Sequence, residues 1–142
     1  MGFAAERQAI EEKIKLSSAG GTWGLDPKYI GFPNSPIEDP GQNLHIKVNF
    51  VNGDEEDIEI GRPTLRRYIN VLMIQIFQPQ NTGTRQALAI ADIVEATFRD
   101  LVLTAGAGKI RFYTPKVRDL GDEEEGYYQI NVECPYKLDE RK

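Results

Sequence analysis

Residues 67–85 read RYINVLMIQIFQPQNTGTR, and this stretch contains a strand, a stop, a polar turn and the start of a helix. From Tyr68 to Phe77 the residues are β-branched, aromatic or otherwise apolar on both alternating faces, a pattern typical of a strand covered on part of both sides. Pro79 lacks a backbone N–H, so we expect the strand pairing to end there. A long, largely buried strand is therefore the first element that the sequence predicts.

The polar residues after Pro79 predict the N-terminus of a helix. Short side-chain oxygens in the sequence Asn81-Thr-Gly-Thr84 can accept the backbone amides that a first helical turn leaves unsatisfied. We expect the helix to cover about residues 85–103 and to end at Gly106-Ala-Gly108. Its apolar positions follow the three-and-four spacing of one buried stripe, made of Leu88, Ala91, Val94 or Glu95, Phe98, Leu101 and Val102.

The composition is that of one soluble, folded domain. The chain has 142 residues, of which 40% are hydrophobic and 27% charged, enough for a single core. Seventeen basic and 22 acidic side chains give a net charge of −5, so the phosphate backbone of DNA would be repelled rather than bound. Cys134 is the only cysteine, which excludes an internal disulfide and favours a reducing compartment. Glu6 and Arg7 interrupt the apolar core that a signal sequence would need, and we expect neither export nor membrane insertion.

An amphipathic helix is predicted at about residues 3–16. Phe3, Arg7, Ile10 and Ile14 recur there at helical spacing. The next six residues, SSAGGT, favour a flexible break, so we expect this helix to dock loosely on the rest of the domain.

Two strands are predicted before the long strand. Residues 28–32 favour a short strand, and residues 44–50 alternate strictly between apolar and polar side chains, as in a half-buried strand. Asn52-Gly53 predicts a tight turn, after which Ile58 and Ile60 would return antiparallel beside the alternating strand.

Two more strands are predicted after the second helix. Residues 109–114 and 127–132 would form a hairpin around an acidic loop, and residues 137–142 would be a frayed tail. These elements predict a single α+β domain, with an antiparallel sheet of five or six strands and two helices packed on it. The N-terminal helix is placed at about 3–16 and the core at about 28–136.

The sequence offers no catalytic constellation. His45, the only histidine, falls on the polar side of an alternating strand and is interpreted as a surface residue. Cys134 is interpreted as a small hydrophobic residue that packs against the core just after the last strand. Gly106-Ala-Gly108 lacks the spacing of a dinucleotide-binding turn. We therefore expect neither an enzyme nor a cofactor-binding protein.

Two acidic runs stand out, Asp54–Asp57 and Asp122–Glu125. Neither has the ligand spacing of a calcium loop, so we expect solvated loop tips and no metal site. A functional alternative is that such tips line a channel and repel DNA phosphates, so that a duplex slides through without sticking. The channel-lining candidates are Asp122, Glu123, Glu124 and Glu125.

Three stretches carry a resemblance to a known family. They are Pro33–Pro40 (PNSPIEDP), Ile74–Arg85 with Ala89–Asp92 in the following helix, and Gly126–Val132 (GYYQINV). In their order and spacing the chain resembles the phage tail terminators, small tail-completion proteins related in fold to the lambda tail terminator. The resemblance spans about residues 28–136. It departs at Tyr127, where many relatives carry tryptophan, and the aromatic character is kept.

The resemblance implies a structural phage or prophage protein without enzymatic activity. Such a protein would form a hexameric ring on the end of the tail tube, stop tube polymerisation and offer a surface to the head connector, while DNA passes through without specific binding. Assembly would take place in the bacterial cytoplasm and the product would stay in the virion tail. We expect subunit or tube contacts at the turn and at nearby arginines, namely Arg62, Arg66, Arg67, Pro79, Asn81, Thr82, Gly83 and Arg85.

Two other readings of the sequence remain open. One is another neck component of the same particle, such as a head-closure or connector protein, which would share size, acidity and ring geometry. The other is a small enzyme or ligand-binding α+β domain with a pocket built around His45, Tyr68 or Tyr128.

Overall fold

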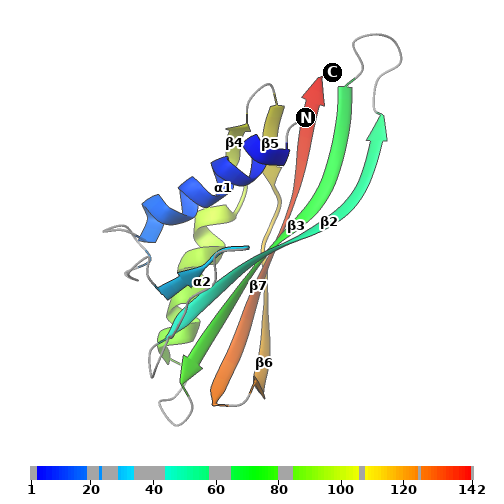
Figure 1. Ribbon diagram of the computed structural model, residues 1–142. Helices are drawn as coiled ribbons and strands as arrows, with labels where there is room; N and C mark the ends of the chain where they lie inside the picture. Colours follow the sequence, from blue (N-terminus) through cyan, green and yellow to red (C-terminus); the bar gives the residue numbers. More distant parts are fainter. Residues whose placement is uncertain are drawn as a thin grey trace.

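The computed structural model describes residues 3–18, 23, 29–33, 44–57, 65–79, 85–105, 108–124 and 126–141. These residues form an α+β fold with two helices and a strongly twisted, mixed sheet of seven strands (Figure 1), which confirms the predicted fold class with a larger sheet. In chain order the elements are α1 (Phe3–Ser18), β1 (Ile30–Gly31), β2 (His45–Asp57), β3 (Leu65–Pro79), α2 (Arg85–Phe98), β4 (Val102–Ala105), β5 (Gly108–Phe112), β6 (Lys116–Glu124) and β7 (Tyr127–Arg141).

The two longest strands form the centre of the sheet. β3 and β7 have 15 residues each and pair antiparallel over their whole length, from Leu65 opposite Arg141 to Pro79 opposite Tyr127. The strand order is β1-β2-β3-β7-β5-β4, and β6 also pairs with β7. Only the two-residue β1 pairs in parallel among the described strands. β3 ends at Pro79 as predicted from the missing N–H.

The predictions for the C-terminal part need three corrections. β5 does not form a hairpin around the acidic segment, because it pairs with the second half of β7, residues 136–140. The acidic segment is itself the strand β6, which pairs with the first half of β7. The stretch from Lys137 to Arg141 is not a frayed tail, because β3 and β5 hold it from both sides.

Pro135 lies inside β7, where a proline is normally excluded. Its carbonyl accepts a hydrogen bond from the Tyr113 amide at 2.9 Å, so its nitrogen faces the same edge of β7. At this point β5 has ended, at Phe112 opposite Tyr136, and β6 has not yet begun pairing, at Lys116 opposite Glu133. The missing N–H therefore falls where β7 passes from one neighbour to the other.

Asn52-Gly53 is not a tight turn, because β2 continues through it with a bulge between Asn52 and Glu55. The Gly53 amide donates to Asn70 Oδ1 at 3.0 Å. A Cβ atom at Gly53 would lie 2.2 Å from the Ile69 carbonyl oxygen, so only glycine allows this approach of β2 to β3. The predicted return through Ile58 and Ile60 lies outside the described residues.

The helix α2 begins at Arg85 as predicted but ends at Phe98, earlier than predicted. Asp100 has a φ of 54°, and the Leu101 amide donates to the Phe98 carbonyl at 3.2 Å, which turns the chain out of the helix. The following residues form β4 because they pair with β5. The inward side of α2 is made of Ala87, Ile90, Ala91, Val94 and Phe98. Leu88, predicted to be part of the buried stripe, is 41% exposed and points outward.

The core lies between the two helices and one face of the sheet. On this helix side, β3 and β7 contribute the fully buried residues Leu72, Ile74, Ile76, Ile130, Val132 and Cys134. The rings of Phe98, Phe112 and Tyr136 pack in sequence at centroid distances of 5.0 Å. Cys134 is a buried residue of the core as predicted, although it lies within β7 and not after the last strand, and burial raises the pKa of its thiol.

The helix α1 is anchored to the sheet and does not dock loosely. Ile10 and Ile14 are fully buried, and Glu6 is buried beside them. Glu6 Oε1 accepts a hydrogen bond from Asn70 Nδ2 at 3.1 Å and another from the Tyr136 hydroxyl. Burial, and then the Glu6 carboxylate, raises the pKa of Tyr136. This network ties the first helix to both central strands.

Candidate assembly surfaces

The residues predicted to make subunit contacts lie at opposite ends of β3. Arg66 and Arg67 are at its start and Pro79 at its end, twelve residues and about 40 Å further along the strand. Arg85, an exposed residue, begins α2 a few residues after Pro79. Arg62, Asn81, Thr82 and Gly83 lie outside the described residues. The fold therefore separates Arg66 and Arg67 from Pro79 and Arg85, and these four residues do not form one patch on a single subunit.

Arg67 is engaged within the chain. Its Nε and Nη2 atoms donate to Asp139 Oδ1 and Oδ2 at 2.8 and 3.2 Å, a two-pronged contact between β3 and β7. Arg66 lies in register between Asp57 of β2 and Glu140 of β7. This end of the sheet thus alternates acidic and basic residues from strand to strand.

His45 is not a surface residue, which corrects the prediction. It is 3% exposed, stacks on Phe77 at 5.0 Å and meets Tyr127 edge-on at 4.9 Å. The alternation along β2 correctly predicted which side of the strand His45 is on. It could not predict the burial of His45, because Phe77 and Tyr127 come from β3 and β7, far away in the sequence. Tyr127, where the sequence differs from the tryptophan expected from the family resemblance, belongs to this aromatic cluster. Pro79 pairs with Tyr127 in the sheet and is buried.

The acidic candidates lie at the end of β6. Asp122, Glu123 and Glu124 are in the strand, while Glu125 lies outside the described residues. Next to them, Asp119 accepts hydrogen bonds from the Tyr128 hydroxyl at 2.6 Å and from the Gly121 amide at 3.1 Å. In the described part of the chain no group of histidine, cysteine and carboxylate residues is placed to hold a metal ion.

His45, Tyr68 and Tyr128, each a candidate centre of the alternative pocket, lie apart from one another in the described structure. Tyr68 packs on the helix side of the sheet, nine positions along β3 from the partner of His45, or roughly 30 Å away. Tyr128 bonds to Asp119 at the β6–β7 hairpin.

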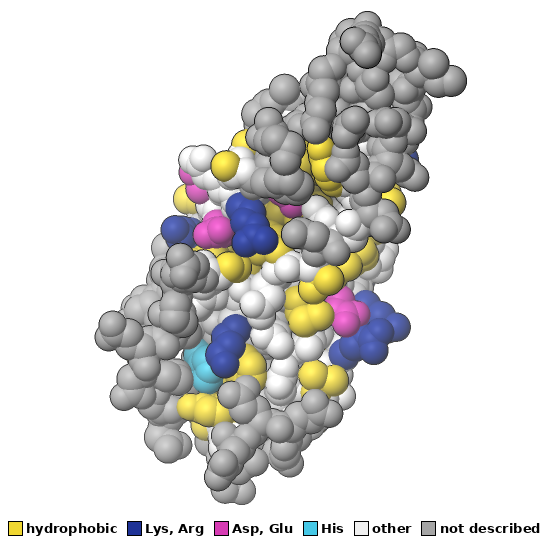
Figure 2. Space-filling view, turned by 45° about the vertical axis from the view of Figure 1, so that its right-hand side comes forward, with side chains coloured by type: hydrophobic (Ala, Val, Ile, Leu, Met, Phe, Trp, Pro, Cys, Tyr) yellow, Lys and Arg dark blue, Asp and Glu magenta, His cyan; other side chains and the backbone are white. Residues whose placement is uncertain are grey.

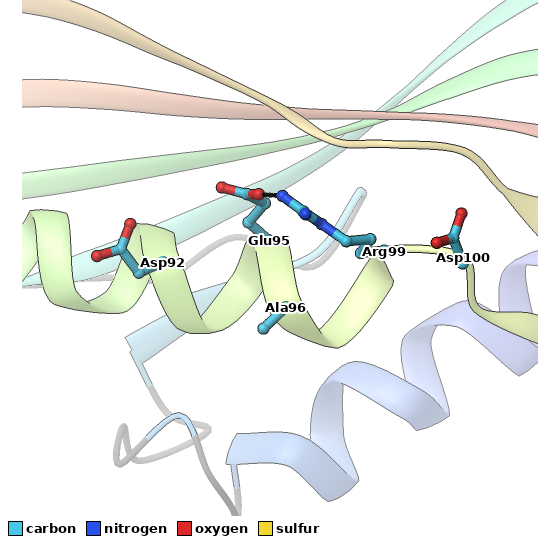
Figure 3. Close-up of a pocket in the computed structure, with 5 residues that line it drawn as sticks. All are labelled: Asp92, Glu95, Ala96, Arg99 and Asp100. Carbon is cyan, nitrogen blue, oxygen red and sulfur yellow. Dashed lines mark ion pairs between the residues drawn. The ribbon is translucent and has the colours of Figure 1, made fainter.

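Two open hollows lie on the helical layer instead. One runs along α2 and is lined by Asp92, Glu95, Ala96, Arg99 and Asp100, with Arg99 paired to Glu95 (Figure 3). The other lies between α1 and α2 and is lined by Lys13, Ser17, Ile93, Ala96 and Thr97. Neither of these hollows contains a residue of the predicted pocket.

The opposite face of the sheet is bare of helices in the described structure, since α1 and α2 both lie on one side (Figure 1). We call it the open sheet face. It consists of the odd-numbered residues of β2 up to Val51, of β3 and of β7, with their register neighbours in β5 and β6. At one end this face is buried, at His45, Phe77, Gln129 and Asn131. Figure 2 turns this side forward and shows hydrophobic and basic side chains on it, with a few acidic side chains beside the basic ones. Val51 and Ile69 are 48% and 42% exposed there.

Comparison with protein families decides the class of the chain. A family model described as phage tail terminator protein matches residues 18–136, from the end of α1 into the second half of β7. The chain belongs to the phage tail terminator family. Membership assigns a structural role in a phage tail, in agreement with the predicted resemblance. The tail terminator family is a structural one, and the virion tail is the location that it fits.

A solved structure shares the fold of this tail terminator. It superposes with a TM-score of 0.71 at 18% identity, over 97% of this chain and 96% of that chain. Coverage at this level includes most of α1, which precedes the family match. No curated protein matches the sequence. In the described part of the chain, neither helix has the length and apolar character that spanning a membrane requires.

Proposed function

We propose that this tail terminator caps the tail tube as a ring of identical subunits, ends tube polymerisation and forms the surface to which the head is joined. The observation that supports the proposal most is the family match over residues 18–136. A sheet face that no described helix covers also supports it, because each subunit of a ring needs a broad surface for its neighbour. A ring of six subunits is the form that we expect.

We propose that the turn before α2 contributes to the subunit contacts. Pro79 ends β3 and Arg85 is exposed at the start of α2, so the segment between them connects the sheet to the helical layer. Arg62, Arg66 and Arg67 are the second group of candidates. Since Arg67 already holds Asp139, a contact through Arg67 would share this carboxylate with the neighbouring subunit or with the tube.

We propose that DNA passes through the ring without specific binding. The chain carries a net charge of −5, and the acidic run that begins at Asp122 includes Asp122, Glu123 and Glu124 at the end of β6. Carboxylates that line a channel repel phosphates and keep a moving duplex from sticking. The partners of the ring would then be the tail tube below it and the head connector above it.

Electron microscopy of tails made with and without the gene tests this function. We expect overlong tubes of scattered length without the gene, and tubes of uniform length with a ring at the end that faces the head when the gene is restored. Tails of normal length that fail to join heads would instead assign the protein to head joining alone, as in a neck adaptor. Fully normal particles without the gene would refute a role in the tail.

A further inference from the structure

We infer that the open sheet face receives the outward side of α2 from a neighbouring copy of this chain, in a head-to-tail contact. The inference rests on the proposed ring and names its subunit interface. It follows from three observations: the apolar centre of the open sheet face, its excess of basic residues, and the composition of the exposed side of α2.

The centre of the open sheet face is apolar and uncovered by the described elements. Val51 pairs with Val71, which pairs with Pro135, so one apolar row crosses β2, β3 and β7. Ile69 lies beside this row, and Met73 follows on the other side along β3. An antiparallel sheet normally presents polar residues on a solvated face, so exposed valine and isoleucine at its centre indicate a covering partner.

The charges on this face are unbalanced, although the chain as a whole is acidic. Among the described side chains, Glu133 and Asp139 are its two acidic residues, and they pair with Arg118 and Arg67. Lys109, Arg111 and Lys116 have no carboxylate partner in the part of the chain that the structure describes. The basic residues of the face whose side chains the structure describes are Lys47, Arg67, Lys109, Arg111, Lys116, Arg118 and Lys137. The partner of this face should therefore present carboxylates.

The exposed side of α2 has the matching composition. Leu88 is 41% exposed, and Ala89 and Ala96 are exposed near it on the helix surface. The carboxylates of Asp92 and Asp100 line the hollow along α2 (Figure 3) and are not paired to a cation within the described residues. Apolar residues could thus meet the valine row while the carboxylates approach the basic residues at its border. This arrangement, apolar in the centre and charged at the rim, is typical of protein interfaces.

The placement of the two surfaces determines the symmetry. α2 packs on the helix side of the sheet, so its outward side and the open sheet face lie on opposite sides of one subunit. A contact between different surfaces of identical subunits repeats from copy to copy and closes into a ring when the rotation permits. Duplex DNA is the other polyanion that a basic face could attract, but the exposed valine and isoleucine favour a protein.

Cysteine cross-linking in assembled tails tests the contact. Cys134 is buried, so Ile69→Cys on the open sheet face and Leu88→Cys on α2 would be the reactive thiols. With a short bismaleimide we expect no cross-link in tails of either single variant, a dimer when the two variants are produced together, and a ladder that ends at the closed ring when one chain carries both. Leu16→Cys, at a 76% exposed position of α1, is the matched control and should not cross-link to Ile69→Cys.

Other outcomes would overturn the inference without touching the proposed function. Dimers from Ile69→Cys alone would show two sheet faces in contact, and no cross-link in tails of uniform length would place the interface elsewhere.

A charge exchange provides a second experiment: Arg111→Glu and Asp92→Lys should each reduce the fraction of tails with normal length, and their combination should restore it. If the Arg111→Glu and Lys109→Glu variants still cap tails and only lose affinity for duplex DNA, the face binds nucleic acid instead. Tails of normal length without the gene would refute the function itself.

Discussion

Gly53 occupies a position where even one added carbon atom would collide with the backbone. The bulge of β2 brings its Cα so close to β3 that a Cβ would lie 2.2 Å from the Ile69 carbonyl oxygen. Backbone atoms in the middle of a paired strand cannot move aside as a flexible side chain can. The same residue donates its amide to Asn70, which in turn bonds to Glu6 of α1, so a shift of β2 would reach the buried network.

We predict that Gly53→Ala lowers the free energy of unfolding by about 1–3 kcal/mol, because the bulge must open to admit the methyl group. Urea denaturation followed by circular dichroism measures the loss. Val51→Ala, an exposed change two residues earlier on β2, should cost less than about 1 kcal/mol. Equal stability of Gly53→Ala and the parent chain would mean that β2 can shift freely at the bulge.

Asp100 is a position where, in contrast to Gly53, a substitution should stabilise the fold. Its φ of 54° is a left-handed conformation that glycine adopts without strain, and its negative charge lies at the C-terminal end of α2, where the helix dipole disfavours it. We predict that Asp100→Gly raises the free energy of unfolding of the subunit by about 0.5–1 kcal/mol. Asp100→Asn separates the contribution of charge from that of backbone. A lower melting temperature for the glycine variant would contradict the assignment of strain.

The helix α1 depends on a single carboxylate at its buried side. Glu6 accepts hydrogen bonds from Asn70 and from Tyr136, so it joins the helix to β3 and β7 at once. Ile10 and Ile14 of the same helix are fully buried and add apolar contacts with the core. Polar groups buried in this way stabilise the fold only while all their partners are present.

We predict that Glu6→Ala costs about 1–3 kcal/mol of stability, because it leaves a buried amide and a buried hydroxyl without their acceptor. Hydrogen exchange should show faster opening of α1 than of β3 and β7. Glu6→Gln keeps an acceptor oxygen and should cost less. Glu12→Ala, on the exposed side of the same helix, is the control and should change stability by less than about 0.5 kcal/mol.

Two buried groups of β7 make the fold sensitive to alkaline pH. Burial raises the pKa of Cys134 above its ordinary value of 9.0 and the pKa of Tyr136 above its ordinary value of 10.0. Above these values the unfolded chain loses the two protons while the folded chain keeps them, so unfolding becomes more favourable. Their contribution to stability is complete below pH 9 and declines as the pH rises further.

We therefore predict that the urea midpoint falls above about pH 9, and that Cys134→Ala makes this fall shallower even though it lowers stability at neutral pH by opening a small cavity. Measuring the midpoint at several pH values for both chains isolates the thiol from the lysines and other tyrosines. Parallel curves for the two chains would show that the thiol is not protected in the folded state.

The proposed ring requires contacts between copies of the whole subunit, and Arg85 is the simplest residue with which to test them. It is exposed at the start of α2, so Arg85→Glu should leave the fold intact. We predict an unchanged circular dichroism spectrum and a smaller fraction of tails with uniform length. Glu12→Lys, a charge reversal on α1, should leave tail length unchanged. A variant that fails to fold would defeat the assignment of Arg85 to an interface.

The sequence revealed those features that depend on neighbouring residues. The long strand, its end at Pro79 and the start of α2 at Arg85 are encoded locally by apolar alternation, a missing N–H and helical spacing. The sequence does not predict β4, because Val102 continues the helical spacing of α2. This segment is a strand only because it pairs with β5. The charged segment after Tyr136 was assigned to a tail for the same reason, since its two partner strands come from earlier parts of the chain.

The open sheet face is even harder to predict from the sequence. Its seven basic residues with described side chains come from five strands, and only the register of those strands places them on one face. Helical spacing alone allows Leu88 on the buried side of α2. The way in which α2 packs on the sheet decides instead that Leu88 is exposed. Alternation can show which residues share a side of one strand, but not which strands are neighbours.

The position of β7 after the other described strands in the chain means that the sheet can be completed only late in synthesis. β7 pairs with β3 on one edge and with β5 and β6 on the other, yet it follows all three in the chain. Until it is synthesised, β1-β2-β3 and β4-β5 are separate pieces with unpaired edges, which are prone to aggregate. Chains cut short before Tyr127 should therefore be degraded as unfolded products. If the proposed capping function holds, errors in translation would then reduce the supply of caps without producing defective ones that could occupy the end of a growing tube.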